Sequence, residues 1–317
     1  MKAAALGSAP GARMRDDAAV RQRPRPRIAP CVPVTGRRAA PWIAAAVVAT
    51  AGLAGCSGAP DDGSGAEGAP PVHVHGMGVN PADGSLYVAT HTGLFHAAPG
   101  SDDVARIDDR RQDTMGFAVA GPDRFIGSGH PDLREDLPPL LGLIESTDAG
   151  GTWRSVSLLG DADFHSLAVS GDRVYGYDAT GERFMASTDG GRTWRASAMP
   201  PVESLAVDPS DPRRVMAATV AGLLVSGDGG RGWAAMPGLP GLLAWPERDR
   251  LYSVYSNGEV QISRDGGRSW SARGSVPGDP AALTALDGAT LIVALHEGGF
   301  ASSDDGGATW AAGPWPS

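Results

Sequence analysis

One eight-residue pattern recurs five times between residues 146 and 310 of this 317-residue chain. Each copy keeps Ser, Asp, Gly and Trp at fixed positions. The copies cover residues 146–153, 187–194, 226–233, 263–270 and 303–310. Their tryptophans are 41, 39, 37 and 40 residues apart. A repeat of about 40 residues matches one four-stranded blade, so the spacing predicts a β-propeller.

The chemistry of the pattern indicates a tight hairpin turn. Its carboxylate can accept backbone N–H groups inside the turn, and its glycine supplies a positive φ. The serine can cap the same turn, and the tryptophan opens the next strand as a packing anchor. The five aspartates are therefore predicted to be structural: Asp148, Asp189, Asp228, Asp265 and Asp305.

The number of blades follows from the length of the repetitive region. Residues 72–317 give 246 residues, or 41 per unit if there are six. The chain contains 45 Gly and 26 Pro and little helical periodicity, which favours short strands and tight turns. The first unit, residues 72–98, keeps three strands but has lost the turn pattern. We predict an all-β, six-bladed β-propeller; a seventh blade would require strands hidden within residues 98–112.

The amino-terminal segment has the pattern of a secretory signal. Nine basic and two acidic side chains occupy residues 1–38, and the apolar run that follows is shorter than the ~20 residues of a membrane span. The run ends in Leu-Ala-Gly before Cys56, which resembles the lipobox of bacterial lipoproteins, where this cysteine is acylated. An uncleaved membrane anchor is the alternative. We expect a signal at 1–55, a lipidated Cys56 and flexible tether at 56–71, and a propeller at 72–317 on the outer face of the cell membrane.

Charge and cysteine content limit the partners of the mature chain. Cys31 would leave with the signal and Cys56 would be lipidated, so no disulfide is expected. Beyond residue 55 the chain has 18 basic and 34 acidic side chains, a net charge of −16. Such a body is a poor partner for nucleic acid and can concentrate cations. We expect a monomer that contacts the membrane only through its lipid.

Histidines and carboxylates gather at one end of the predicted blades. The start of an inner strand and the end of its hairpin partner meet at the same edge of a sheet. In the first three units these positions hold His73, His75, His91, Asp113, His130, Asp163, His165 and Asp178. The other three units hold fewer titratable residues there. This asymmetry predicts a functional mouth over blades 1–3.

Imidazoles at this spacing suit a transition metal. His73 and His75 are two residues apart, so both point to the same side of a strand. Several imidazoles with nearby carboxylates are a ligand set for Zn, Cu or Fe. The predicted metal ligands are His73, His75, His91, His130 and His165. A metal site, a site for a small molecule or glycan, and a solvated polar funnel are the three interpretations.

A long connection in the second unit, residues 130–142, leaves from the same edge. Loops of this length in a compact blade are usually lids or binding loops. Two carboxylates ~5–10 Å apart would allow glycosidase acid/base chemistry. The candidate catalytic residues are Asp132, Glu135 and Asp136, and a solvated charged loop is the alternative. The candidate ligand-binding residues are Asp113, Arg134, Asp163 and Asp178.

The repeated pattern resembles the Asp-box, the hairpin turn of the sialidase and BNR-repeat superfamily, over residues 72–317. That superfamily also includes sortilin-type receptors and photosystem II assembly-factor propellers. The segments HVHGMGVNP, RRQDTMGF, GSGHPDLREDLPP and LGLIESTDAGGTW are similar to a family of bacterial lipoproteins commonly labelled glycosyl hydrolase or exo-α-sialidase. The resemblance implies a ligand-binding propeller, a glycoside hydrolase or an assembly scaffold.

The sialidase motif set is incomplete in this sequence. No Arg-Ile-Pro precedes Ser146, and besides Arg134 only Arg110 and Arg111 lie near a mouth in the first three units, so the three-arginine carboxylate clamp is missing. The chain also has no phosphate-cradling loop, no G-x-S-x-G and no Cys-x-x-Cys. Whether the protein catalyses a reaction stays open at the level of sequence.

Overall fold

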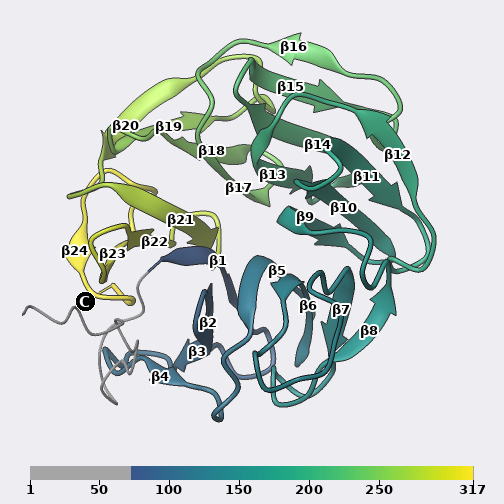
Figure 1. The fold of residues 1–317 in the computed structure, drawn as a ribbon. Coiled ribbons are helices and arrows are strands. Elements are labelled where there is room, and N and C mark those ends of the chain that lie inside the picture. Colours follow the sequence, from purple (N-terminus) through teal and green to yellow (C-terminus); the bar gives the residue numbers. More distant parts are fainter. Residues whose placement is uncertain (1–72, 317) are drawn as a thin grey trace, which may run out of the picture. The chain divides into compact units, whose positions relative to one another are not determined.

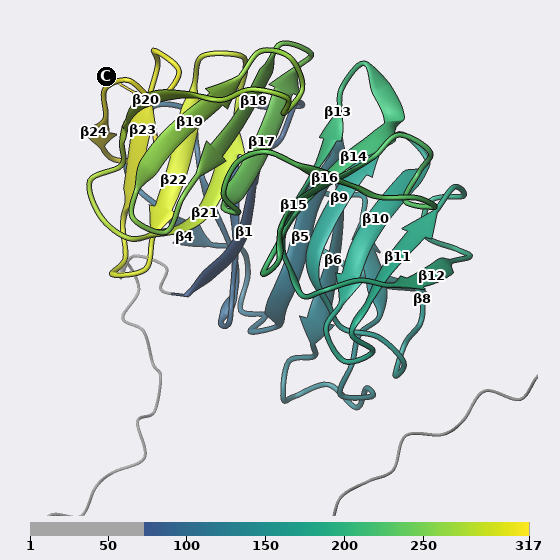
Figure 2. The ribbon, with the colours of Figure 1, turned by 90° about the horizontal axis from the view of Figure 1, so that it is seen from above.

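The computed structural model describes residues 73–316, which form six four-stranded antiparallel sheets around a central axis (Figures 1 and 2). The predicted all-β, six-bladed propeller is confirmed, and no helix occurs among the described residues. Nothing in this part of the chain forms a helix that could span a bilayer. The predicted signal peptide, Cys56 and the tether lie outside the described residues.

Each blade is built from four consecutive strands, counted from the inside outward. Blades 1 to 3 contain β1 (Val74–Val79), β2 (Leu86–Thr90), β3 (Gly93–Ala97), β4 (Ala105–Arg106); β5 (Asp113–Gly121), β6 (Arg124–His130), β7 (Leu143–Ser146), β8 (Arg154–Ser157); β9 (Phe164–Ser170), β10 (Arg173–Asp178), β11 (Arg183–Ser187) and β12 (Arg195–Ala198).

Blades 4 to 6 repeat the same order. They contain β13 (Val202–Asp208), β14 (Asp211–Thr219), β15 (Gly222–Ser226), β16 (Ala234–Met236); β17 (Leu242–Glu247), β18 (Arg250–Val254), β19 (Glu259–Ser263), β20 (Ser271–Ser275); β21 (Pro280–Ala285), β22 (Leu291–Leu295), β23 (Phe300–Ser303) and β24 (Ala311–Ala312).

The ring closes without exchange of a strand between its ends. β1 lies beside β5 on one side and β21 on the other. One apolar cluster joins blades 1 and 6 and includes Val88, Phe95, Ile292 and Phe300, with Trp315 packed against it. Burial of apolar surface, rather than shared hydrogen bonds, therefore holds the first blade to the last.

The repeated motif forms the turn that its residue types predict. In blade 3 the Oγ of Ser187 donates to Asp189 Oδ1 at 2.7 Å and accepts the N–H of Gly191 at 2.9 Å. The backbone N–H and hydroxyl of Thr193 donate to the two oxygens of Asp189 at 2.9 and 2.6 Å. The prediction that the box aspartates are occupied within their own turns is confirmed, since the backbone N–H bond recurs in the other four boxes. The hydroxyl bond recurs in three of them, because Gly232 stands at this position in blade 4.

The turn requires glycine, and it delivers a tryptophan to the space between blades. Gly191 has a φ of 83°, and a Cβ there would lie 2.1 Å from Leu143 of blade 2. The ring of Trp194 packs 5.0 Å from that of Phe164, and its Nε1 donates to Ser157 at 2.9 Å. The box thus ends one hairpin and also fixes the spacing of neighbouring sheets.

The box turns and the predicted mouth lie on opposite faces of the ring. A box follows the third strand of its blade, whereas the mouth residues begin the first strand or end the second. The N–H of Ala149, in the blade 2 box, donates to Asp123 O in the β5–β6 turn, at the far end of the inner strand. The framework motif and the variable residues are therefore separated by the height of the propeller (Figure 2).

Replacement of a box serine is expected to destabilise the propeller. Ser263 is fully buried, and its hydroxyl accepts the N–H of Gly267 at 2.7 Å. Ser263→Ala leaves that buried donor without a partner, which should lower the free energy of unfolding by about 1–3 kcal/mol in urea denaturation. Ser271→Ala, on exposed β20, is the matched control. Equal stability of the two variants would show that the serine bond does not hold the turn.

Candidate metal centre at the mouth of the channel

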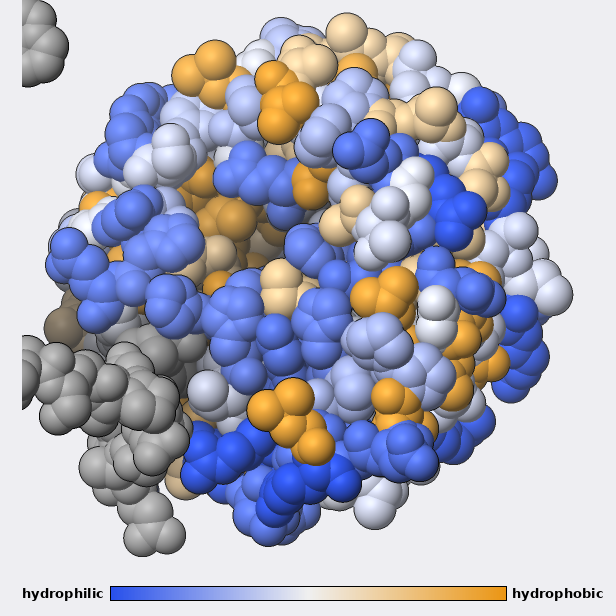
Figure 3. Space-filling view, viewed as in Figure 1, coloured by the Kyte–Doolittle hydropathy of each residue, from blue (hydrophilic) through white to orange (hydrophobic). Residues whose placement is uncertain are grey.

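The inner strands of the six blades enclose a central cavity of about 860 Å³. Its lining combines apolar side chains, such as Leu205, Leu243 and Leu283, with polar groups, such as Glu203 and Ser204. Figure 3 shows the mouth face, where hydrophilic side chains gather beside the hollow on the side of blades 1 and 2. A cavity of this size that combines apolar side chains with convergent polar groups has the form of a ligand site.

Strand polarity brings the predicted residues to this rim. Val74 pairs with Thr90 in blade 1, and Asp113 pairs with His130 in blade 2. The inner-strand starts and second-strand ends therefore meet, as the sequence predicts. The histidines at this edge are His73, His75, His91, His130, His165 and, from blade 6, His296.

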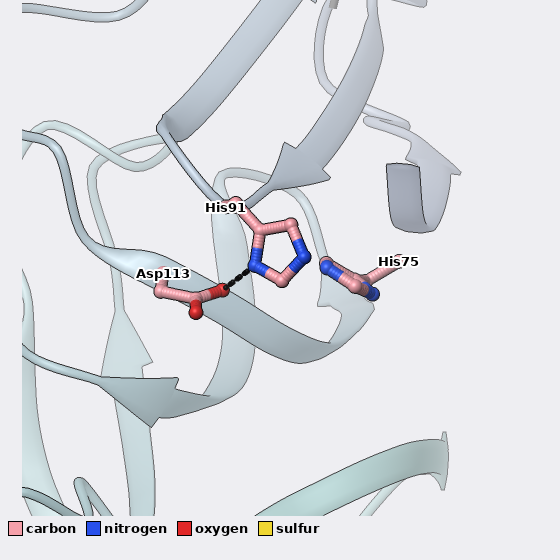
Figure 4. A group of neighbouring side chains, drawn as sticks. All are labelled: His75, His91 and Asp113. Atoms are coloured by element: carbon pink, nitrogen blue, oxygen red, sulfur yellow. Dashed lines mark hydrogen bonds and ion pairs between the residues drawn. The ribbon is translucent and has the colours of Figure 1, made fainter. Parts of the chain in front are cut away.

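Three of these residues converge across blades 1 and 2. One ligand atom from each of His75, His91 and Asp113 lies within 4.8 Å of the other two (Figure 4). Nδ1 of His91 donates to Asp113 Oδ1 at 2.9 Å, and the other ring nitrogen of His91 lies on the side of His75. A carboxylate on one nitrogen fixes the tautomer that leaves the other free to bind a metal.

His75 is the most perturbed imidazole at the rim. Burial, followed by the neighbouring His91 ring, lowers the pKa of His75 to about 4. Its ring lies 4.2 Å from that of His91, and its Nε2 is buried without a hydrogen-bond partner. A neutral, unpartnered imidazole nitrogen is the state that a metal ligand requires. The His73 ring lies 5.6 Å from His91, at the edge of this cluster.

A second cluster lies across blades 2 and 3. His165 Nε2 donates to Asp163 Oδ2 at 2.9 Å, and this bond raises the pKa of His165. His130 Nε2 lies 3.6 Å from the same oxygen, while its Nδ1 donates to the carbonyl of Pro139 at 2.7 Å. The side chain of Asp163 is 6% exposed.

Asp178 supports this second cluster from behind. It is fully buried, accepts the backbone N–H of Asp163 at 3.1 Å, and pairs with Arg183 at 2.8 Å. It therefore positions Asp163 and has no exposed surface with which to contact a ligand directly. The sequence pattern predicts the position of Asp178 at the rim. It does not predict the ion pair with Arg183, five residues further along the chain.

The candidate catalytic loop extends from the mouth face but is tied into ion pairs (Figure 2). Asp132 is buried, and Arg134 donates to both of its oxygens, through Nε at 3.0 Å and Nη2 at 2.6 Å. This contact holds the pKa of Asp132 well below its usual range. Glu135 pairs with Arg110 at 3.1 Å, and Asp136 is exposed. The structure places these three carboxylates on one loop, and the Arg134 contact keeps Asp132 ionised at neutral pH.

Comparison with known proteins gives the class of fold. A family model of the BNR/Asp-box repeat matches residues 261–272. Among solved structures, an ancestral GH74 enzyme is 15% identical, with a TM-score of 0.53 over 74% of this chain and 36% of that one. The GH74 xyloglucanase from Xanthomonas campestris is 18% identical, with a TM-score of 0.53 over 78% of this chain and 46% of that one.

A third similar structure is YCF48 bound to D1 peptide, at 15% identity and a TM-score of 0.50 over 78% of this chain and 82% of that one. No characterised protein matches the chain by sequence. The chain spans less than half the length of both GH74 structures. At these identities the likeness is one of fold: the chain is a β-propeller with Asp-box turns, one of which matches the BNR/Asp-box repeat model.

Proposed function

We propose that this protein is an exported, lipid-anchored propeller that binds a divalent transition-metal ion, Zn, Cu or Fe, at its mouth. The observation that carries the proposal is the buried, unpartnered Nε2 of His75 beside His91 and Asp113. A buried polar atom without a partner costs about 1–3 kcal/mol, which an ion at this position would offset. Neither a solvated funnel nor a purely scaffolding propeller requires that atom to be desolvated.

The donor set fits a catalytic or transport type of centre better than a structural one. Two imidazoles with a carboxylate behind one of them leave coordination positions open, whereas structural zinc sites are filled by four protein ligands. An ion there borders the 860 Å³ cavity, so a small molecule or glycan in the cavity could reach it. We infer that the ion anchors such a ligand.

Metal content tests the proposed centre. The full chain, purified in detergent without a histidine tag and incubated with Zn²⁺, should retain the ion after dialysis. His75→Ala combined with His91→Ala should lower its affinity for Zn²⁺ at least about 100-fold, because both nitrogen ligands are gone. His96→Gln, a histidine on β3, is the control. Retention of equal zinc by the double variant would exclude this site.

The lipid anchor has its own test. Residues 1–55 and Cys56 have the composition of a lipoprotein signal, which supports acylation at Cys56. Wild-type protein should enter the detergent phase in phase separation, and Cys56→Ser should move to the aqueous phase because it lacks the acyl chains. A serine variant that stays in the detergent phase would favour the uncleaved anchor.

The alternative function is a glycoside hydrolase that uses the blade 2 loop carboxylates; a GH74 xyloglucanase is among the proteins of similar fold. A general acid must carry a proton at neutral pH, and the Arg134 contact keeps Asp132 ionised. We therefore expect no turnover of aryl sialosides or aryl glucosides by the wild type. Hydrolysis that disappears in Asp132→Asn, Glu135→Gln or Asp136→Asn would reverse this ranking.

A further inference from the structure

Exposed apolar side chains gather on the mouth face rather than on the face that carries the box turns. Six large apolar side chains are exposed among the described residues, and five of them lie in connections at the mouth edge. These five are Leu133, Leu137, Leu159, Val220 and Leu239. The sixth, Leu286, lies in the β21–β22 turn on the box face. Single exposed leucines need no explanation, but their accumulation on one face indicates an interaction surface.

Three of these leucines form a leucine patch at the edge of blades 2 and 3. Leu133 and Leu137 lie on the β6–β7 loop, and Leu159 lies on the β8–β9 connection. The two segments contact each other, since the N–H of Gly160 donates to Leu140 O at 2.8 Å. Leu133 is fully exposed, and its loop projects beyond the rest of the mouth face (Figure 2). The leucine patch is therefore the first part of the mouth to meet an approaching surface.

The charged side chains of the same loop are held in ion pairs. Arg134 pairs with Asp132 at 2.6 Å and with Asp109 at 2.9 Å. Glu135 pairs with Arg110 at 3.1 Å. Charges that are paired cost less to remove from water than separate charges do. The loop can therefore approach an apolar surface without leaving these four acidic and basic partners isolated.

The amino-terminal end of the described chain lies at the same face. His73, the first described residue, is at the mouth edge. Residues 57–72 separate it from Cys56, and sixteen residues of this Gly-containing, polar composition have a root-mean-square reach of about 20–24 Å. A lipid on Cys56 therefore keeps the mouth face near the bilayer. Because the domain is tethered, docking is an intramolecular step, and a few apolar side chains are enough to drive it.

We propose that the leucine patch docks on the membrane and inserts its side chains at the boundary between headgroups and acyl chains. The inference rests on the lipid anchor of the proposed function, and it replaces the expectation that the lipid is the only contact with the membrane. That expectation came from net charge, which averages over the whole surface and does not register where apolar side chains gather. Apolar burial drives such docking, so a neutral lipid surface is favoured over an anionic one that repels the acidic body.

Photo-crosslinking to lipid tests the docked face. The full chain is reconstituted on phosphatidylcholine vesicles that contain a phosphatidylcholine with a diazirine in its acyl chain. After flotation, mass spectrometry identifies the crosslinked peptides. We expect crosslinks within residues 131–142 and 158–162, and none within 286–289. Leu133→Asp combined with Leu137→Asp should lower the yield in the loop at least about tenfold, because two exposed leucines no longer enter the lipid. Leu286→Asp, on the box face, is the matched control.

The outcomes separate the docked face from the anchor. A wild-type chain that floats with the vesicles but has no crosslinks in the leucine patch overturns docking, leaves the anchor in place and frees the patch for a protein partner. Equal yields in the double variant and in Leu286→Asp overturn docking as well. A Cys56→Ser chain that floats and crosslinks through the patch upholds docking and removes acylation. A wild-type chain that does not float contradicts both.

Discussion

The serine–aspartate turn is the interaction on which the rest of this structure depends. It binds backbone groups within four residues along the chain, as Ser187 and Asp189 do, and so closes each outer hairpin independently of the other blades. It also delivers a tryptophan to the gap between neighbouring sheets. Both contacts lie on one face of the ring. Residues on the opposite face are therefore not needed to close the hairpins or to space the blades. Blade 1 has no box, and an apolar cluster packs it against blade 6.

The fold could be read from the sequence because its determinants are local. The spacing of the tryptophans equals the length of one blade. Each turn is held by hydrogen bonds between residues two to four positions apart. The mouth could be predicted in outline for a related reason: strand polarity alone decides which ends of strands meet, and it correctly brought His75, His91 and Asp113 together. No tertiary contact had to be known for that step.

The atomic roles at the mouth could not be predicted, because they depend on partners that no spacing specifies. The Pro139 carbonyl selects the tautomer of His130, and it comes from a loop that follows no repeat. Arg134, two residues further along the chain, donates to both oxygens of the candidate catalytic Asp132. Arg183 donates to Oδ2 of Asp178. Residue type and position predict where a side chain lies. Its hydrogen-bond partners decide whether it is still available to bind a ligand.

The separation of framework and mouth explains how charged groups can accumulate where they do. Among the described residues, the six apolar clusters that stabilise the blades contain no mouth histidine, so substitutions at the rim leave the core packing intact. The acidic body, with a net charge of −16 beyond residue 55, raises the local concentration of cations around the rim. Burial then keeps His75 neutral, which removes the competition between a proton and a metal at that nitrogen. The negative charge of the body and the burial of His75 therefore favour the same occupant, a cation. The central cavity behind the rim leaves room for a ligand bound to that cation.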